Sequence, residues 1–186
     1  NIDEVAERIG AVNTIVNDDG VLKGYNTDWL GVVIPLEKIT SLKNKRVALI
    51  GAGGAARAVA YGVTRRGSRL TVFNRTIVKA QELAKEFGGD ARSFDVIEEV
   101  RNMDIIFNAT SVGLYIKEFI TDKHIVFDAI YVPCETRLLR EAKEQGARII
   151  CGMEMLLQQG IAQFKLYTGL DVPEGTMRDV LLEYLN

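Results

Sequence analysis

The sequence predicts an α/β fold, with a doubly wound parallel sheet that carries helices on both of its faces. From Val47 onward, short apolar runs rich in β-branched residues alternate with stretches of helical periodicity. This order of elements is typical of a parallel sheet covered by helices. In addition, the first apolar run leads straight into a glycine-rich turn and then into a helical stretch. With 186 residues and 47% hydrophobic content, the chain can bury a sizeable core.

The first strand, predicted over Arg46–Ile50, is followed by the spacing G-x-G-x-x-A, with Gly51, Gly53 and Ala56 at the fixed positions. Gly51 permits a tight bend, Gly53 lets bare backbone approach a pyrophosphate, and Ala56 keeps the next helix, residues 55–66, close to the sheet. This pattern is typical of a Rossmann-like dinucleotide site, and a purely structural glycine turn is the alternative. The residues predicted to bind the cofactor phosphates are Gly51, Ala52, Gly53, Gly54 and Ala55.

The end of the second strand, residues 70–73, predicts which cofactor binds. An NAD site usually has an acidic residue about twenty residues after the glycine turn, where it holds the ribose hydroxyls. This chain instead has Asn74, Arg75 and Thr76, with Lys79 one helical turn further on. A guanidinium with amide and hydroxyl neighbours suits a 2′-phosphate through charge-assisted bonds. The sequence therefore favours NADP over NAD; the alternative is that Arg75 and Lys79 are only a solvated helix start.

The remaining elements complete a predicted sheet of six strands. In chain order they are a helix at Ile77–Phe87 ended by Gly88 and Gly89, a short strand at 91–93, a weak helix at 96–100, strands at 104–108 and 125–129, a helix at 136–145 and a strand at 148–151.

The two ends of the chain do not follow this scheme. Residues 12–25 alternate around Asn-Asp-Asp-Gly, which predicts a hairpin, and residues 29–39 predict a connecting helix. Residues 153–167 and 178–184 predict two further helices that pack back toward the hairpin side. We expect the chain to be part of something longer. The expected parts are a remnant of a substrate domain at 1–28, a connecting helix and linker at 29–45, a nucleotide-binding domain at 46–152 and C-terminal helices at 153–186.

Composition argues against several classes of partner. The net charge is −2 without long blocks of like charge, which gives no support for a nucleic-acid or membrane-surface partner. No apolar run has membrane-spanning length and the first residues do not resemble a signal peptide, so a cytoplasmic location is expected. With two cysteines, Cys134 and Cys151, no C-x-x-C and one histidine, His124, the sequence indicates neither a disulfide framework nor a zinc site. We expect His124 to precede a strand.

Five blocks together resemble the shikimate dehydrogenase family. The blocks run Gly10 to Thr14, Gly24 to Asp28, the glycine turn with Asn74-Arg75-Thr76, Asn108 to Gly113, and Gly152 to Gln159. The resemblance covers essentially the whole chain but only the later part of a full family member. Quinate/shikimate dehydrogenases share most blocks, but an NAD-using quinate enzyme is expected to carry an acid near Thr76. Glutamyl-tRNA reductase shares the Asn-Arg-Thr signature and lacks the hairpin blocks.

This resemblance implies NADP-dependent reduction of 3-dehydroshikimate to shikimate, a reversible step of aromatic amino-acid biosynthesis. It implies that Asp28 pairs with a catalytic lysine, because hydride transfer to a carbonyl needs a proton donor at the developing alkoxide. The substrate residues it implies are Asn13, Asp28, Tyr131 and Gln159. The cofactor residues it adds are Asn108, Ala109, Thr110, Ser111, Gly152 and Met155.

Structural readings of these residues remain open. Asp28 could serve only as the N-cap of the connecting helix, Asn13 could only satisfy the hairpin backbone, and Gln159 could be an exposed helical residue. Tyr131 and Met155 could simply fill the core.

The chain also departs from the family pattern. The family's catalytic lysine and a serine pair that holds the substrate carboxylate correspond to positions upstream of Asn1, and the loop after Gly113 is short. A non-catalytic NADP-binding module and a quinate/shikimate dehydrogenase are therefore alternative functions, and an oligomer is possible.

Overall fold

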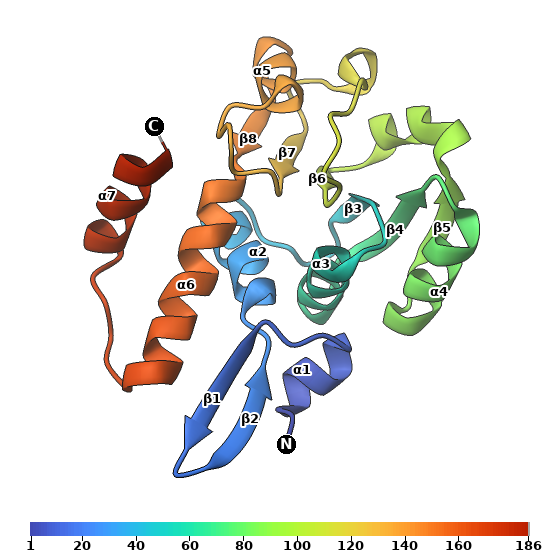
Figure 1. Ribbon diagram of the computed structural model, residues 1–186. Helices are drawn as coiled ribbons and strands as arrows, with labels where there is room; N and C mark the ends of the chain where they lie inside the picture. Colours follow the sequence, from blue (N-terminus) through green and yellow to red (C-terminus); the bar gives the residue numbers. More distant parts are fainter. Residues whose placement is uncertain (186) are drawn as a thin grey trace.

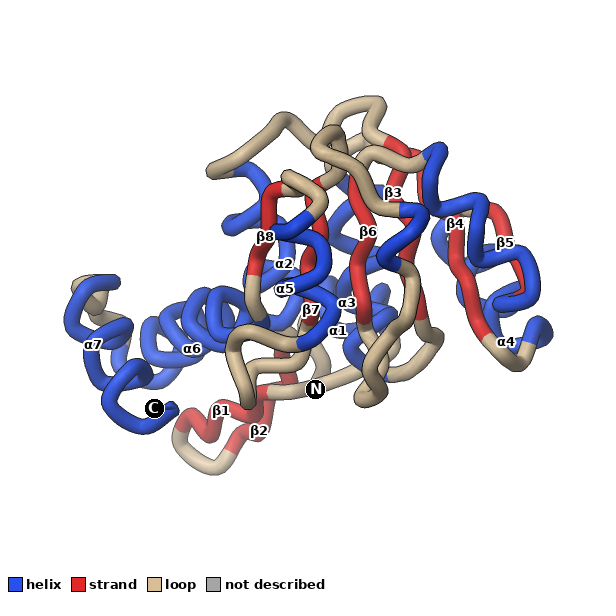
Figure 2. Tube along the Cα trace, turned by 90° about the horizontal axis from the view of Figure 1, so that it is seen from above, coloured by secondary structure: helices blue, strands red, loops and turns tan. Residues whose placement is uncertain are grey.

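The computed structural model describes residues 1–185, and its centre is a six-stranded parallel sheet (Figure 1). The strand order is β5-β4-β3-β6-β7-β8, which Figure 2 shows with β8 and β5 at the two edges. From β3 the chain first adds β4 and β5 on one side, and then returns to place β6 on the other side of β3. The strand order therefore reverses between β3 and β6, and the loops after these two strands leave toward opposite faces of the sheet. The strands span Arg46–Ile50 (β3), Arg69–Asn74 (β4), Asp90–Ser93 (β5), Ile105–Asn108 (β6), Ile125–Asp128 (β7) and Arg148–Ile150 (β8). The predicted fold class and the six strands are confirmed.

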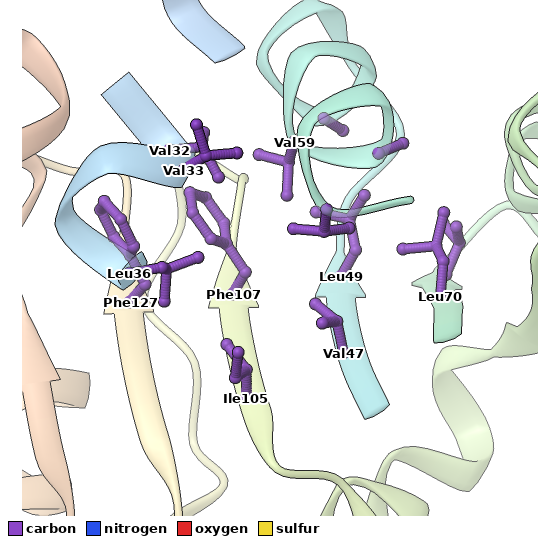
Figure 3. Close-up of a cluster of buried hydrophobic side chains, with 14 of the residues drawn as sticks. Val32, Val33, Leu36, Val47, Leu49, Val59, Leu70, Ile105, Phe107 and Phe127 are labelled. Carbon is purple, nitrogen blue, oxygen red and sulfur yellow. The ribbon is translucent and has the colours of Figure 1, made fainter. Parts of the chain in front are cut away.

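Helices cover both faces of the sheet, which explains why its strands are apolar on both sides. One face is covered by α2 (Asp28–Glu37), α3 (Gly54–Arg65) and α4 (Ile77–Phe87). In Figure 3, Val33 of α2 and Val59 of α3 lie over Phe107 and Leu49 of the sheet. The other face is covered by α5 (Arg137–Glu144) and the two 3₁₀ helices η1 (Phe94–Asn102) and η2 (Lys117–Phe119).

The hairpin is also as predicted. It consists of β1 (Thr14–Asp18) and β2 (Val21–Tyr25), joined by a two-residue turn in which Asp19 and Gly20 have φ angles of 47° and 87°. Two positive φ angles define the type I′ turn, whose twist matches that of the strands. The hairpin lies outside the sheet, beyond the amino-terminal end of α2 (Figure 1).

Two local elements differ from the prediction. A short helix, α1 (Glu4–Ile9), was not predicted; Asp3 caps its start by accepting a hydrogen bond from the Val5 N–H, and Gly10 ends it in the left-handed region. The weak helix predicted at 96–100 is the 3₁₀ helix η1, in which the backbone of Val96 is not helical. Val96 is β-branched, and a β-branched residue loses rotamer freedom in a helix.

Helix α6 (Gly152–Thr168) lies along α2, and the last helix, α7 (Glu174–Leu185), lies on the outer side of α6 (Figure 1). Glycines allow the close contacts. A Cβ atom at Gly31 of α2 would lie 2.5 Å from the Met155 carbonyl oxygen of α6, and one at Gly62 of α3 would lie 2.9 Å from Val33 Cγ1. None of the helices described in residues 1–185 is long and apolar enough to cross a membrane.

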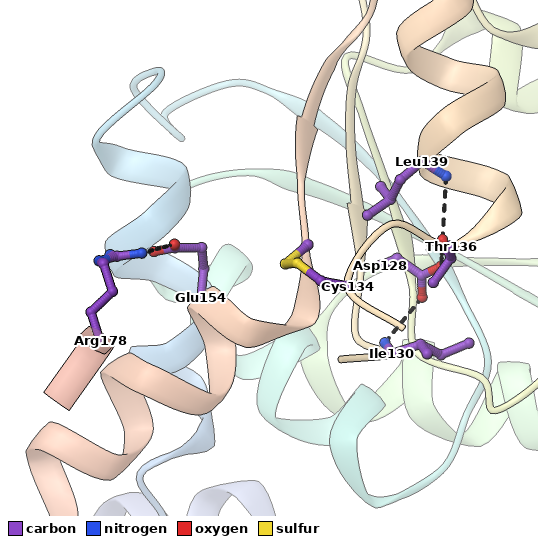
Figure 4. Close-up of a disulfide and its surroundings, with 8 residues drawn as sticks. Asp128, Ile130, Cys134, Thr136, Leu139, Glu154 and Arg178 are labelled. Carbon is purple, nitrogen blue, oxygen red and sulfur yellow. Dashed lines mark hydrogen bonds and ion pairs between the residues drawn. A yellow bond between two sulfur atoms is a disulfide. The ribbon is translucent and has the colours of Figure 1, made fainter. Parts of the chain in front are cut away.

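The two cysteines, for which the sequence indicates no disulfide framework, are paired. Cys134 and Cys151 form a disulfide, with their Cα atoms 5.6 Å apart (Figure 4). The two residues lie beyond the carboxyl ends of neighbouring parallel strands, β7 and β8, so the topology brings them together. A separation of 17 residues along the chain does not by itself indicate that two cysteines are close in space. His124 lies directly before β7, as predicted.

Ion pairs attach α7 to the rest of the molecule. Arg178 donates to Glu154 of α6 (Figure 4) and to Glu174, and Lys38 donates to Glu174 at 2.9 Å. Lys38 and then Arg178 lower the pKa of Glu174 from 4.5 to about 2. Because the folded-state pKa is lowered, the stabilisation is present above pH 4.5 and is lost as the pH falls toward about 2.

We therefore expect Arg178→Met to loosen α7 at neutral pH. These side chains are partly exposed, so a loss of about 1 kcal/mol is expected, or about a fivefold decrease in hydrogen-exchange protection of the α7 amides. Lowering the pH from 4.5 to 2 is expected to produce a similar loss in the unsubstituted protein. Arg8→Gln, which removes an exposed ion pair with Glu4 on α1, is the matched control. Unchanged exchange in Arg178→Met would show that apolar contacts alone hold α7.

Candidate functional site

The glycine turn has the backbone geometry that its sequence predicts. Gly51 has φ +109°, and its N–H donates to the Phe73 carbonyl at 2.9 Å. A Cβ atom there would lie 3.0 Å from Thr110 Cγ2 and 3.1 Å from the Ala109 carbonyl oxygen, so both the conformation and the space require glycine. Gly53 is the N-cap of α3 and has no side chain. The N–H groups in the first turn of α3 therefore have no capping side chain as a hydrogen-bond partner.

The space in front of this helix start is open. A Cβ atom added at Gly53 or Gly54 would meet no atom within 4 Å. Uncapped N–H groups at the positive end of a helix form a ready-made site for a phosphate group. The turn therefore fits the pyrophosphate of a dinucleotide: it leaves free space for the phosphates and offers backbone N–H groups as hydrogen-bond donors.

The turn opens into a cavity of about 610 Å³, here called the glycine-turn cavity. Ten of its lining residues were predicted as cofactor-binding: Gly51, Ala52, Gly53, Asn74, Arg75, Thr76, Lys79, Ala109, Thr110 and Ser111. The lining residues that the sequence analysis missed are Ile50, Phe73, Phe94, Val112, Gly113, Leu114 and Tyr115. Several of these are apolar, as is typical of the walls of a ligand pocket.

The charges of this cavity favour an anion at the end of β4. Arg75 and Lys79 line it, and none of its lining residues is an Asp or a Glu. Within residues 1–185, neither cation forms an ion pair with another side chain. The Asn74 amide donates to the Thr76 carbonyl at 2.9 Å and so fixes the turn that presents Arg75. Two cations without an ion-pair partner, in a cavity whose lining residues include no carboxylate, are the arrangement that binds a phosphate rather than ribose hydroxyls.

Asn108 lies apart from the other residues predicted at the end of β6. Its side chain is fully buried and does not line the cavity. Asn108 Nδ2 donates to Asp128 Oδ1 at 2.9 Å, and Asn108 Oδ1 accepts from the Thr110 hydroxyl at 2.7 Å. Asp128 in turn accepts from the Thr136 hydroxyl at 2.8 Å (Figure 4), and burial raises the pKa of Asp128. Asn108 therefore orients Thr110, which does line the cavity.

A second cavity, of about 330 Å³, lies between the hairpin, α2 and α6; it is here called the hairpin cavity. All four residues predicted for the substrate line it: Asn13, Asp28, Tyr131 and Gln159. The other lining residues are Ala55, Ala129, Gly152, Met155, Leu156 and Gln163. Three residues predicted as cofactor-binding, Ala55, Gly152 and Met155, thus line this cavity and not the first. Both cavities reach the start of α3, because Gly53 lines one and Ala55 the other.

Asp28 is held at the wall of the hairpin cavity by Asn13. Asn13 Nδ2 donates to Asp28 Oδ1 at 2.7 Å. Asn13 Oδ1 accepts from the Thr27 N–H at 3.0 Å and from the Thr14 hydroxyl at 2.8 Å, which fixes the orientation of the amide. Burial raises the pKa of Asp28, and the bond from Asn13 acts in the opposite direction.

Asp28 is not the N-cap of α2 in the structure. The N-cap of α2 is Thr27, which makes no side-chain cap bond, and Asp28 is the first helical residue. Its own N–H donates to Asn26 Oδ1 at 3.0 Å, while its carboxylate accepts from Asn13. The carboxylate is therefore available at the cavity wall. No lysine, arginine or histidine is among the residues that line this cavity.

Helix α6 supplies amides to the same wall. The Thr27 hydroxyl donates to Gln159 Oε1 at 3.5 Å, and Gln159 Nε2 donates to the Leu156 carbonyl. Gln163, which the sequence analysis missed, donates to the Thr14 hydroxyl at 3.0 Å. Its position four residues after Gln159 places both on one face of the helix, and this spacing could have indicated it.

Tyr131 and Met155 differ in their surroundings. Tyr131 is 47% exposed, so the core-filling reading does not hold for it. Met155 is 8% exposed and packs in the main core, yet it also lines the hairpin cavity, so both readings of this residue apply.

Taken together, the phosphate-binding turn at the point where the strand order reverses and the adjoining carboxylate–amide cavity define a dinucleotide-dependent oxidoreductase. Comparisons with known proteins agree. A family model described as shikimate/quinate 5-dehydrogenase matches residues 35–133, and one described as the shikimate 5′-dehydrogenase C-terminal domain matches residues 152–182. The chain belongs to the shikimate/quinate 5-dehydrogenase family.

Individual relatives show how much of the family's length the chain spans. A shikimate dehydrogenase (NADP(+)) of Nitrosopumilus maritimus is 43% identical over 97% of this chain and 71% of the relative. A crystal structure of a shikimate dehydrogenase in complex with NADP⁺ superposes with a TM-score of 0.93 at 38% identity, over 100% of this chain and 70% of that one. The enzyme of Thermus thermophilus, in complex with NADP(H) and shikimate, has a TM-score of 0.89 at 37% identity, over 98% and 71%.

Proposed function

We propose that this chain provides the NADP(H) site and one wall of the substrate site for the reversible reduction of 3-dehydroshikimate to shikimate. The observation that carries the proposal is the pairing of two cavities at the start of α3. One has Arg75 and Lys79 without any carboxylate, and the other has a carboxylate among amides. The first suits a phosphorylated ribose and the second suits a ring that carries several hydroxyl groups.

In this proposal the cofactor is bound by residues of the glycine-turn cavity. The N–H groups at the start of α3 hold the pyrophosphate, with Gly53 leaving room for it. Arg75 and Lys79 hold the 2′-phosphate, and Thr110, which is oriented by Asn108, lies beside the cofactor at the end of β6. Bound NADPH supplies the hydride.

The hairpin cavity is proposed to orient the substrate. The amides of Asn13 and Gln159 and the hydroxyl of Tyr131 are hydrogen-bonding partners for ring hydroxyls. Asp28 is proposed to hold a lysine that protonates the developing alkoxide during reduction and takes the proton back in the reverse direction. Since no lysine is among the lining residues, we propose that the lysine comes from a segment outside residues 1–185, as the greater length of the relatives allows.

Two alternatives can be separated from this proposal by measurement. Quinate as the substrate would show as tighter binding of quinate than of shikimate. A non-catalytic NADP-binding module would bind NADP and bind neither acid. The proposed location is the cytoplasm. The proposed partners are small molecules rather than nucleic acid, since the net charge is close to zero.

Cofactor preference gives a direct test. Arg75→Ala is expected to weaken NADP binding by about 1.5–3 kcal/mol, the range for hydrogen bonds to charged groups, and to leave NAD binding nearly unchanged. Calorimetric titration of both cofactors measures this. Arg69→Ala is the matched control, because Arg69 is exposed at the opposite end of the same strand. Equal losses for NADP and NAD would contradict the assignment of Arg75 to the 2′-phosphate.

A further inference from the structure

The disulfide joins two segments that meet at the hairpin cavity. Cys134 lies in the loop between β7 and α5, and Cys151 is the N-cap of α6. Tyr131 of the loop lines the cavity, and so does Gly152, the residue next to Cys151. We propose that Cys134 and Cys151 form a thiol–disulfide exchange site whose oxidised form holds Tyr131 at the hairpin cavity and whose reduced form releases it.

The two ends of this loop are fixed without the disulfide. The Ile130 N–H donates to Asp128 Oδ1 at 3.1 Å and the Thr136 hydroxyl donates to Asp128 Oδ2 at 2.8 Å (Figure 4). The carbonyl of Ile130 also accepts from the Gly152 N–H at 3.3 Å. A Cβ atom at Gly152 would lie only 2.4 Å from the Ala129 carbonyl oxygen, so the start of the loop rests directly on the start of α6.

Residues 131–135 between these ends have no such attachment. Within the described part of the chain, none of the five forms a hydrogen bond or an ion pair. Val132 is 60% exposed, and Pro133 and Glu135 are exposed as well. The bond from Cys134 to Cys151 is therefore the one attachment of this segment between its fixed ends. Without it, residues 131–135 are connected to ordered structure only at their two ends, through Ile130 and Thr136.

The chemistry of the switch is thiol–disulfide exchange with a thiol reductant of the glutathione or dithiol class. A thiolate of the reductant attacks one sulfur and forms a mixed disulfide, and a second thiolate of the reductant displaces the cysteine. The Cys134–Cys151 bond receives two electrons and two protons, and the reductant leaves as its own disulfide. Both cysteines are partly exposed, so the sulfur atoms are not sealed in the core. In the proposed cytoplasmic location, a disulfide of this kind is typically transient or redox-sensing.

The effect of reduction is confined to one cavity. None of residues 131–135 lines the glycine-turn cavity, whereas Tyr131 lines the hairpin cavity. Releasing a side chain that must be ordered again on binding lowers the apparent affinity by the fraction of molecules in the competent state. We expect reduction to weaken shikimate binding about fivefold or more, and to leave binding of adenosine 2′,5′-bisphosphate unchanged. The shikimate part of this expectation rests on the proposed function.

The experiment uses a polypeptide long enough to include the lysine proposed as the partner of Asp28, and compares it after treatment with oxidised glutathione and with dithiothreitol. Alkylation followed by mass spectrometry counts free thiols, and ¹⁵N relaxation measures the order parameters of residues 131, 132, 134 and 135. For these residues we expect order parameters of about 0.85 in the oxidised protein and below about 0.6 in the reduced protein. Calorimetry with shikimate and with adenosine 2′,5′-bisphosphate follows on the same samples.

A double variant, Cys134→Ser with Cys151→Ser, separates reduction from side effects of the reagents. It is expected to show low order parameters under both treatments and to keep its affinity for adenosine 2′,5′-bisphosphate, which shows that it is folded. Free thiols after oxidised glutathione, or order parameters that do not change on reduction, would overturn the exchange site. If the order parameters fall but the oxidised protein binds no shikimate, the exchange site stands and the substrate assignment fails.

Discussion

A Gly53→Val variant is expected to remain folded and to lose binding of both NADP and NAD. A Cβ atom at Gly53 meets nothing within 4 Å, so the folded protein has room for the valine. The same open space is where the pyrophosphate must approach the N–H groups of α3. Losing two charge-assisted hydrogen bonds at about 1.5–3 kcal/mol each weakens binding at least about 100-fold.

Circular dichroism and calorimetric titration together measure this result. Gly51→Ala is a useful contrast, because Gly51 has a positive φ angle and a crowded Cβ position. It is expected to lower the melting temperature, whereas Gly53→Val is not. A folded Gly53→Val variant that still binds NADP would mean that the turn is only structural.

Asp28→Asn is expected to lower the catalytic rate by about 10²–10⁴-fold, the usual contribution of a positioned proton transfer. The rate is measured as NADPH formation from shikimate at saturating NADP, in a polypeptide long enough to include the lysine proposed as the partner of Asp28. Residues 1–186 alone are expected to bind NADP but not to oxidise shikimate, because no lysine among the described residues lines the hairpin cavity. Cofactor affinity is expected to be nearly unchanged by the substitution.

Stability gives a second, independent measurement on the same variant. Burial raises the pKa of Asp28, so the folded state binds this proton more tightly than the unfolded state. The carboxylate therefore costs stability increasingly as the pH rises from 3.8 through its folded pKa. Asp28→Asn is expected to melt at a higher temperature than the unsubstituted protein at neutral pH, and the difference is expected to shrink in acid. Asp18→Asn, in the exposed end of the hairpin, is the control for this stability measurement. In the rate measurement, an unaltered rate in Asp28→Asn would show that Asp28 takes no part in catalysis.

The nucleotide-binding half could be predicted from sequence because its signals are local. The strand over Arg46–Ile50, the glycines that follow and the helix over Ile77–Phe87 each depend on neighbouring residues, and the structure has them at these bounds. Arg75 and Lys79 could be placed because they follow directly from the end of a strand. Parallel strands bring such ends to one edge of the sheet, where ligands bind.

The missed features depend on contacts between distant parts of the chain. The Cys134–Cys151 bond exists because β7 and β8 are neighbours, and Gln163 reaches the hairpin because α6 lies along α2. Likewise, nothing local separates Ala55, which lines the hairpin cavity, from Gly53, which lines the glycine-turn cavity. Which residue lines which cavity depends on how the first turn of α3 is oriented between the two cavities.

The glycine contacts between helices have a mechanical consequence. Asp28 lies one turn before Gly31 on α2, and Gln159 lies one turn after Met155 on α6, so a contact that involves the α6 backbone fixes the spacing of these two wall residues. Gly62 joins α2 in the same close way to α3, the helix that begins at the phosphate-binding turn. The three helices therefore behave as one stiff block, since packed interiors resist deformation. The carboxylate cannot approach or leave the cofactor by sliding of its own helix, and the movements that admit and release ligands are left to the loops around the block.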